Sequence, residues 1–197
     1  MAALTQPSST ATSLLKIRQA ARVIEAGGIV AYPTEAVYGL GCDPANSGAV
    51  LEILRLKRRP TAAGLILIAA ELHQLEGWIA PSAEELRHLM DAAHTASGIT
   101  WVIRSGPMTP EWITGGRPTT AVRITHHPIA ATLCREAGMP IVSTSANHSG
   151  AKPARSARAV RWAFGTDIDF ILPGGVGPRQ RPSEIRDART GAVLRAG

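Results

Sequence analysis

Residues 27–43 read GGIVAYPTEAVYGLGCD, an apolar run followed at once by small and polar residues. The apolar half predicts a buried β-strand. Thr34 and Glu35 come directly after it, and we expect Gly39 and Gly41 to bend the chain there and to let the backbone approach closely. In α/β proteins, ligands bind where strands end in small or glycine residues. The stretch therefore predicts a ligand site at the end of the first strand of such a fold.

Helical and strand-like segments alternate along the chain. Ser13 is suited to cap a first helix, and Ser82 with Glu85 forms the capping-box pattern of another. We expect helices over 14–26, 47–58, 83–93, 128–137 and 156–164. We expect strands over 29–32, 64–70, 99–104, 119–125, 140–147, 182–188 and 191–195, with a long loop over 106–116. The alternation predicts the α/β class, with a loose tail over 1–13 and a single domain over 14–197 built around a twisted mixed sheet with helices.

The composition excludes several classes of protein. The chain has 197 residues, of which 45% are hydrophobic and 18% charged, as is typical of a globular domain. No apolar run approaches the length of a membrane span, and the N-terminal segment lacks the basic start and apolar core of a signal peptide. The two cysteines, Cys42 and Cys134, form no CxxC pair and suit a reducing cytoplasm. The six histidines show no metal-binding spacing, so we expect no structural metal.

The net charge of +6 is unevenly distributed along the chain. Residues 1–98 hold eight Lys or Arg and nine Asp or Glu, whereas residues 99–197 hold thirteen and six. A basic second half indicates an anionic partner such as a nucleotide, a phosphate or RNA. Arg supplies eighteen of the twenty-one basic residues, so a compositional preference for Arg explains the asymmetry equally well.

Cations stand at two informative places. Lys57 and Arg59 end the expected helix 47–58, on what we expect to be an exposed turn, and the helix dipole alone is a sufficient reason for cations there. Arg123 lies within an expected core strand, where Val122 and Ile124 point to the packed face. The opposite face, which carries Arg123, is then either solvent or a cleft.

The segment STSAN, residues 143–147, follows the strand letters PIV. Its hydroxyl and amide groups suit a phosphate or a carboxylate, although Ser and Asn are also ordinary turn residues. The chain has no P-loop and no GxSxG motif. We therefore expect a site that positions phosphates and stabilises their charge without a covalent nucleophile.

Together and in this order, these segments resemble the YrdC-like threonylcarbamoyl-AMP synthase family. The resemblance rests on GGIVAYPTEAVYGLGCD, LKRRPTAAGLILIAA, TTAVRITHHP, STSANHSG and PSEIRDARTGAVLRAG, and covers nearly all of residues 15–197. It implies a twisted α/β sheet with a large, open, basic cavity. It also implies that L-threonine and bicarbonate form a carbamate, which attacks the α-phosphate of ATP to give threonylcarbamoyl-AMP and pyrophosphate. Partner proteins then pass the threonylcarbamoyl group to an adenosine beside the tRNA anticodon.

The resemblance also implies roles for individual residues. Lys57 and Arg59 match the pair that faces the triphosphate and supports catalysis. The implied ATP-binding set is Lys57, Arg59, Thr100, Thr119, Ser145, Asn147 and Arg195. The set implied at the threonine and carbamate end is Thr34, Arg123, Ser143 and Ser183. We expect Mg²⁺ to arrive with ATP, because the sequence shows no dedicated protein cage for it.

Two places depart from the family pattern. Many relatives have Thr where this chain has Ala36. Relatives usually have PGP where this chain has Ala96, Ser97 and Gly98 ahead of Thr100. Without the prolines we expect a more mobile loop and an altered affinity for the nucleotide.

Two other functions fit parts of the pattern. One is an RNA-binding module without catalysis, supported by the charge asymmetry and by the row Lys152, Arg155, Arg158 and Arg161. If 155–164 is helical, its three arginines share one face, which either follows a tRNA backbone weakly or is simply solvated. The other is a carbamoyl-transfer domain acting on carbamoyl phosphate. Such domains usually sit in much longer chains with acylphosphatase and zinc-finger segments, and these 197 residues contain neither.

Overall fold

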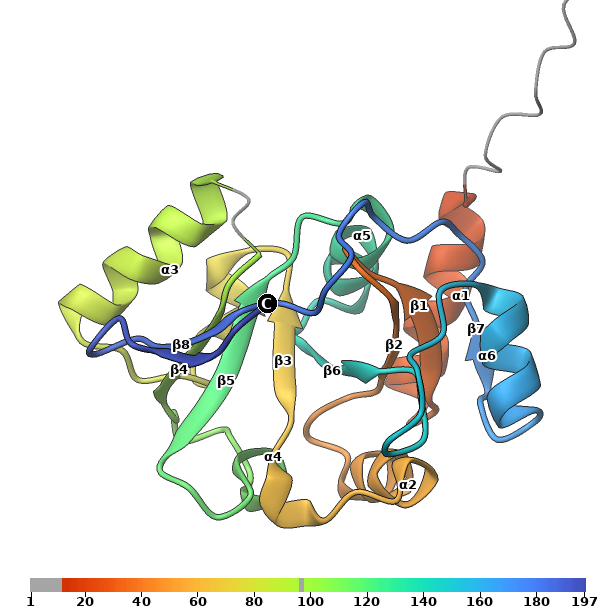
Figure 1. Ribbon diagram of the computed structural model, residues 1–197, viewed down its shortest axis with the longest axis horizontal. Helices are drawn as coiled ribbons and strands as arrows, with labels where there is room; N and C mark the ends of the chain where they lie inside the picture. The colour runs from red at the N-terminus through yellow and green to blue at the C-terminus, as the bar shows by residue number, and fades with distance from the viewer. Residues whose placement is uncertain (1–11, 96–97) are drawn as a thin grey trace, which may run out of the picture.

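The computed structural model describes residues 12–95 and 98–197. Most of the expected tail over 1–13, and the departure at Ala96 and Ser97, lie outside the described residues. The strands are β1 (Val30–Pro33), β2 (Tyr38–Gly41), β3 (Ile66–Ala69), β4 (Thr100–Arg104), β5 (Thr119–Ile124), β6 (Ile141–Ser145), β7 (Phe170–Ile171), β8 (Ile185–Asp187) and β9 (Val193–Arg195). Over the described residues they form one nine-stranded sheet in the order β7-β1-β2-β6-β3-β5-β4-β8-β9 (Figure 1). The pairs β1–β7, β3–β5 and β4–β8 are parallel and the others antiparallel, so the expected mixed sheet is confirmed.

The helices are α1 (Leu14–Glu25), α2 (Ser47–Lys57), α3 (Ala83–Thr95), α4 (Glu111–Thr114), α5 (Pro128–Ala137) and α6 (Ala157–Phe164), with 3-10 turns η1 (Thr61–Ala63) and η2 (Leu72–Leu75). The Asn46 side chain caps α2 by accepting a hydrogen bond from Ala49 N–H at 3.0 Å. The capping box of Ser82 and Glu85 opens α3, as expected. Ser13 precedes α1 but makes no side-chain cap bond. No helix in the described part of the chain is long and apolar enough to cross a membrane.

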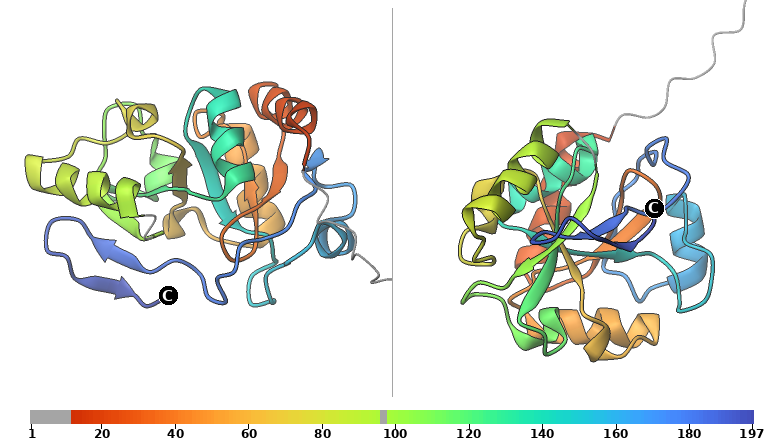
Figure 2. Two further views of the ribbon diagram at one scale, coloured as in Figure 1. Left: turned by 90° about the horizontal axis from the view of Figure 1, so that it is seen from above. Right: turned by 60° about the vertical axis from the view of Figure 1, so that its left-hand side comes forward.

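Two apolar clusters cover the two faces of the sheet. On one face, α1 and α5 lie side by side and pack on the strands through residues such as Ile24, Leu133 and Ile68 (Figure 2, left). On the other face, α2 and α3 pack through residues such as Ile53 and Leu89. Burying each such side chain contributes about 1.5–3 kcal/mol, so both layers hold the sheet in shape.

Strand β2 differs from the sequence prediction, because Gly39 and Gly41 lie inside a strand and do not bend the chain. A Cβ atom at Gly41 would lie 2.4 Å from the carbonyl oxygen of Val142 and 2.8 Å from Cε1 of Tyr32. Glycine is required there because β1, β2 and β6 pack closely, not because the chain turns.

The last part of the chain crosses the sheet. From the α6 side it passes in front of the strands and ends in the hairpin β8–β9 beside β4 (Figure 1). Gly177 N–H donates to the carbonyl of Thr34 at 2.9 Å, and Arg179 N–H donates to that of Glu35 at 3.1 Å. These bonds fix the crossing segment to the loop that follows β1, which is the loop singled out by the sequence.

Candidate active site

A cavity of about 300 Å³ lies on the part of the sheet that α1 and α5 leave uncovered. Residues two apart in a strand share a face, so Thr119, Ala121 and Arg123 of β5 all line it. Ser143 and Ser145 of β6 line it for the same reason. Val122 and Ile124 belong to the opposite cluster, as the sequence predicted. The face that carries Arg123 is therefore a cleft.

Arg123 and Glu35 form an ion pair in this cavity, with 3.5 Å between Nη2 and Oε2. Glu35 Oε1 accepts hydrogen bonds from the Thr125 hydroxyl at 2.7 Å and from His126 N–H at 3.2 Å. Burial alone would raise the pKa of Glu35, but the guanidinium and these donors lower it to about 2. Glu35 is therefore ionised at neutral pH and offsets the charge of Arg123.

Hydroxyl groups continue from Arg123 into the wall. Its Nη1 donates to Ser183 Oγ at 3.1 Å, and Ser183 Oγ lies 2.8 Å from Oγ1 of Thr100. Thr100 is fully buried, so it meets the cavity through Ser183. Arg123 Nε has no hydrogen-bond partner within the described part of the protein. A buried donor without a partner costs free energy, so Arg123 is held here at some cost to stability.

Lys57 ends α2 with only 4% of the residue exposed, so the exposed turn expected from the sequence is wrong. The helix end packs against the segment after β6. There the ammonium donates to the carbonyl of Ser145, to the carbonyl of Asn147 at 2.9 Å and to Asn147 Oδ1 at 3.4 Å. Burial, and then the charge of Arg59, lowers the pKa of Lys57 to about 8. Lys57 holds residues 145–147 in place and puts positive charge behind them.

Three guanidinium groups, those of Arg59, Arg117 and Arg195, line another part of the cavity. Each donates to a backbone carbonyl at 2.7–2.8 Å. Burial, and then the charges of Arg195 and Arg117, lowers the pKa of Arg59. Across residues 12–95 and 98–197, none of the three forms an ion pair with a carboxylate. The cluster therefore suits an anion that carries several charges.

Most of the sequence-predicted site residues line the cavity: Thr34, Arg59, Thr119, Arg123, Ser143, Ser145, Ser183 and Arg195. Three others, Lys57, Thr100 and Asn147, lie behind its walls, and each is hydrogen-bonded to a lining residue. The Ser145 hydroxyl, for example, donates to Asn147 Oδ1 at 2.6 Å. The structure therefore gathers the whole predicted set around one space.

Glu35 and Arg117 also line the cavity, and neither belongs to the set of site residues that the sequence predicts. A charged side chain directly after a buried strand must either form an ion pair or reach solvent. The position of Glu35 in the sequence therefore indicated that it would need such a partner. Arg117 lies two residues before the start of β5 at Thr119, outside the strand, so the alternation of β5 gave no signal for it.

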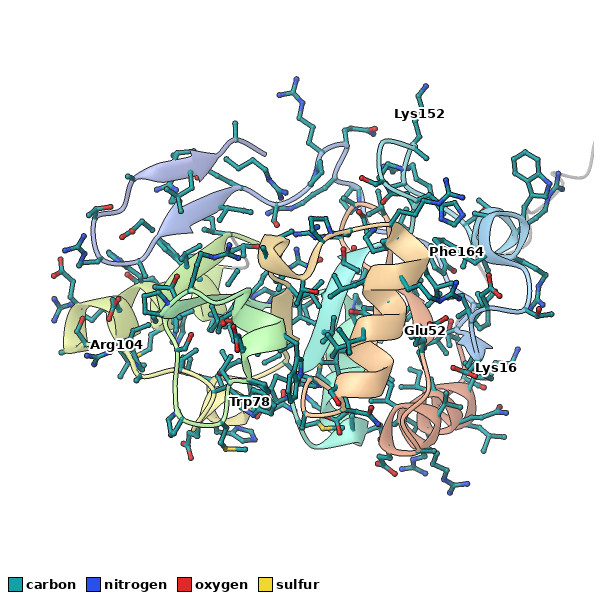
Figure 3. The ribbon with its side chains drawn as sticks, turned by 90° about the horizontal axis from the view of Figure 1, so that it is seen from below. Lys16, Glu52, Trp78, Arg104, Lys152 and Phe164 are labelled. Atoms are coloured by element: carbon teal, nitrogen blue, oxygen red, sulfur yellow. The ribbon has the colours of Figure 1, made fainter. Side chains whose placement is uncertain are left out.

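A row of basic residues lies outside the cavity and is exposed: Lys152, Arg155, Arg158 and Arg161. Lys152 projects away from the fold (Figure 3). The helix expected over 156–164 is α6, which Ser156 caps, so Arg155 precedes the helix and does not share a helical face with Arg158 and Arg161. Trp162, on the same helix, is 93% exposed. The row lies outside the cavity, and Arg155 Nη1 donates to the carbonyl of Arg179, a residue that lines it, at 3.3 Å.

The cavity is able to hold a polyanion beside a smaller polar molecule. Its uncompensated cations lie at Arg59, Arg117 and Arg195, whereas the charge of Arg123 is shared with Glu35. Glu35 is the one carboxylate among the lining residues in the described part of the chain. Within the described ranges, no three His, Cys, Asp or Glu side chains gather as a metal-binding group. Charge stabilisation and positioning are the chemistry that this set supports.

Comparison with known proteins identifies the fold and the family. The family model for the Sua5/YciO/YrdC domain, described as "Telomere recombination", matches residues 22–197. The chain is 50% identical over 184 residues to the threonylcarbamoyl-AMP synthase of Halorhodospira halophila, covering 93% of this chain and 96% of that protein.

Two solved structures have the same fold. Sua5 of P. abyssi, in complex with L-threonine, matches with a TM-score of 0.85 and 36% identity over 93% of this chain and 54% of that one. This chain thus spans about half of Sua5. YciO of E. coli matches with a TM-score of 0.82 and 26% identity, covering 95% of this chain and 91% of that one. The chain therefore belongs to the Sua5/YciO/YrdC family.

Proposed function

We propose that this chain is a threonylcarbamoyl-AMP synthase, a nucleotidyltransferase that makes threonylcarbamoyl-AMP and pyrophosphate from L-threonine, bicarbonate and ATP. The observation that carries the proposal is the single cavity in which uncompensated guanidinium groups lie beside the polar groups around Arg123. The name of the relative with 50% identity, and the L-threonine in the Sua5 structure, support the same activity.

The reaction has two steps. The amine of L-threonine, in its free-base form, forms an N–C bond with the carbon of bicarbonate, and water leaves, which gives a carbamate. A carbamate oxygen then attacks the α-phosphorus of ATP. The bond from that phosphorus to the bridging oxygen breaks, and the electron pair leaves with pyrophosphate. Because no side chain becomes bonded to substrate, the protein has to position the reactants and stabilise charge.

At the nucleotide end, Arg59 and Arg195 bind phosphate oxygens, while Ser145, Asn147 and Thr119 bind the rest of the nucleotide. The three hydrogen bonds from Lys57 support this role, since they fix the 145–147 segment before ATP arrives. Preorganised donors of this kind cost no rearrangement when charge develops in the transition state. Lys57 adds its own charge from behind the segment, and Thr100 acts through Ser183.

At the amino-acid end, Thr34, Arg123, Ser143 and Ser183 bind L-threonine and its carbamate. The proposal is supported by the place of Arg123 in the cavity wall and by the Ser183 hydroxyl beside its guanidinium. Glu35 holds the guanidinium of Arg123 in one direction, so that its remaining donors point to a defined place.

ATP is the substrate, and we propose that Mg²⁺ enters with it. Mg²⁺ prefers oxygen ligands, and the carboxylate of Glu35 is already engaged by Arg123 and Thr125. The product is a reactive mixed anhydride, so partner proteins of tRNA modification consume it nearby. Weak tRNA binding along the exposed basic row fits the same pathway. The buried free thiols of Cys42 and Cys134 suit a cytoplasmic setting.

The test is to incubate the purified chain with ATP, bicarbonate and labelled L-threonine and to separate the products by chromatography and mass spectrometry. We expect labelled threonylcarbamoyl-AMP and an equal amount of pyrophosphate. An Arg59→Ala variant serves as the negative control. A protein that binds tRNA tightly at physiological salt and makes no adenylate would be an RNA-binding module instead.

A further inference from the structure

Arg117 lies at the rim of the cavity and is fixed to the turn η1. Its Nη1 donates to the carbonyl of Ala62 at 2.7 Å. Gly64, at φ +64°, makes room for it, because a Cβ atom there would lie 2.2 Å from Arg117 Nη2. Arg59 is fixed to the same turn, since its Nη2 donates to the carbonyl of Gly64 at 2.8 Å. The two guanidinium groups are therefore held next to each other by one short stretch of backbone.

Among the residues that the structure describes, this pair of like charges has no acidic partner. Glu35, which lines the cavity, is paired with Arg123. The pKa of Arg59 is lowered, mostly by burial and then by the positive charges of Arg195 and Arg117. The last two contributions reflect the repulsion between like charges. Arg59 Nε is buried and has no partner among the described residues. Adjacent, uncompensated guanidinium forks match a ligand with neighbouring anionic oxygens, such as a di- or triphosphate.

The strand order sets the direction of that ligand. Strand β3 lies between β6 and β5, with Ile66 level with Ser143 on one side and Ala121 on the other. The turn before β3 thus lies between Ser145 and Arg117. Neighbouring strands are about 4.8 Å apart, so these two residues are separated by roughly 10 Å across the sheet. A triphosphate whose nucleoside end is held at Ser145 spans this distance toward Arg117.

We propose that Arg117 binds the β- and γ-phosphates of ATP, and therefore the pyrophosphate leaving group, as the outer partner of Arg59. The inference rests on the proposed function for the identity of the substrate. It assigns Arg117 to the leaving group and not to the α-phosphate or the adenosine. Each hydrogen bond between charged groups contributes enough to change affinity about 10- to 100-fold.

The experiment measures the direct binding of ATP, pyrophosphate and AMP to the parent chain, to Arg117→Gln and to Arg117→Lys, by calorimetry without threonine. We expect Arg117→Gln to bind ATP and pyrophosphate about 10- to 100-fold more weakly and AMP within about twofold of the parent. Arg117→Lys keeps the positive charge but loses the planar pair of donors of the guanidinium group. Its affinities for ATP and pyrophosphate should therefore lie between those of the parent and those of Arg117→Gln. Arg158→Gln, on the exposed face of α6, removes the same charge outside the cavity and should change none of the three.

Two outcomes overturn the proposal. Equal loss of AMP and ATP affinity would assign Arg117 to the α-phosphate, and unchanged pyrophosphate binding would exclude it from the leaving-group site. Threonylcarbamoyl-AMP formation is assayed in parallel on the parent chain. If the parent makes the adenylate while Arg117→Gln binds pyrophosphate normally, only this inference fails. If the parent makes no adenylate, the proposed function fails, and the pyrophosphate measurement still decides the role of Arg117.

Discussion

Arg123 and Glu35 lie 3.5 Å apart in the cavity and join the loop after β1 to strand β5. The same carboxylate accepts hydrogen bonds from Thr125 and His126. Glu35 therefore fixes the direction of the Arg123 guanidinium and offsets part of its charge. In the proposed reaction this makes Glu35 a positioning residue for the group that binds threonine.

Replacing Glu35 by Gln should raise the KM for threonine about tenfold or more, because Arg123 loses its ionic partner and its fixed direction. The KM for ATP should stay within about twofold, since the nucleotide end does not contact Glu35. Steady-state kinetics with each substrate varied in turn measures both values. The control is Glu52→Gln, which removes a solvent-exposed ion pair with Arg55 on α2 (Figure 3) and should leave both unchanged. An equal rise in both KM values after Glu35→Gln would contradict a local positioning role.

The same ion pair predicts a dependence of stability on pH. The pKa of Glu35 falls from 4.5 to about 2 on folding, so its contribution is fully present above about pH 4.5. The contribution is lost as the pH falls through 4.5 toward 2. The free-energy difference of unfolding between the parent and Glu35→Gln should be about 2 kcal/mol smaller at pH 3 than at pH 7. Urea unfolding at both pH values measures it, and a difference that does not change with pH would show that folding does not lower the pKa of Glu35.

Lys57→Ala and Arg59→Ala should each reduce the rate of adenylate formation about 10²-fold or more. This is the usual effect of removing one group that stabilises charge in the transition state. Their effects on stability should differ. Lys57 is buried and serves three acceptor atoms, so its removal should cost roughly 1–3 kcal/mol, whereas Arg59→Ala should unfold near the temperature of the parent. Single-turnover assays and thermal unfolding measure the two quantities. Near-normal turnover in either variant would contradict the proposed role of that residue at the triphosphate.

Changing Arg155, Arg158 and Arg161 together to Glu should leave adenylate formation within a few-fold of the parent, because this row lies outside the cavity. Any tRNA binding should weaken, and in the parent it should fall steeply with salt, as phosphate contacts do. The comparison uses synthesis assays and a salt series of tRNA binding. If the triple variant abolishes synthesis while Lys57→Ala spares it, the active site lies on the other surface.

Two features of the fold that depend on residues close together in the sequence, a strand alternation and a helix capping box, were predicted correctly. The alternation around Arg123 correctly predicted its face, and the capping box at Ser82 correctly predicted the start of α3. Strand β2 was missed because Gly39 and Gly41 have low strand propensity. Their reason to be glycine is the close approach of β1 and β6, which no local pattern records.

The site was predictable as a set of residues but not as a set of contacts. The family motifs named the groups around the cavity, whereas the pairing of Glu35 with Arg123 joins segments far apart in sequence. Lys57 stands at the end of the helix expected over 47–58, a position for which the sequence predicts an exposed turn. Its burial results from the segment after β6 folding over the end of α2, which is a tertiary contact.

The central claim is that a carbamate attacks ATP, and pyrophosphate release tests it most directly. Release is measured with ATP in bicarbonate-depleted buffer, with threonine and bicarbonate added separately and together. We predict release only when both are present, and slower release with serine, since one methyl group in a pocket is worth roughly 1–3 kcal/mol. Release at the full rate with threonine and without bicarbonate would contradict the claim, because it would show ordinary amino-acid adenylation.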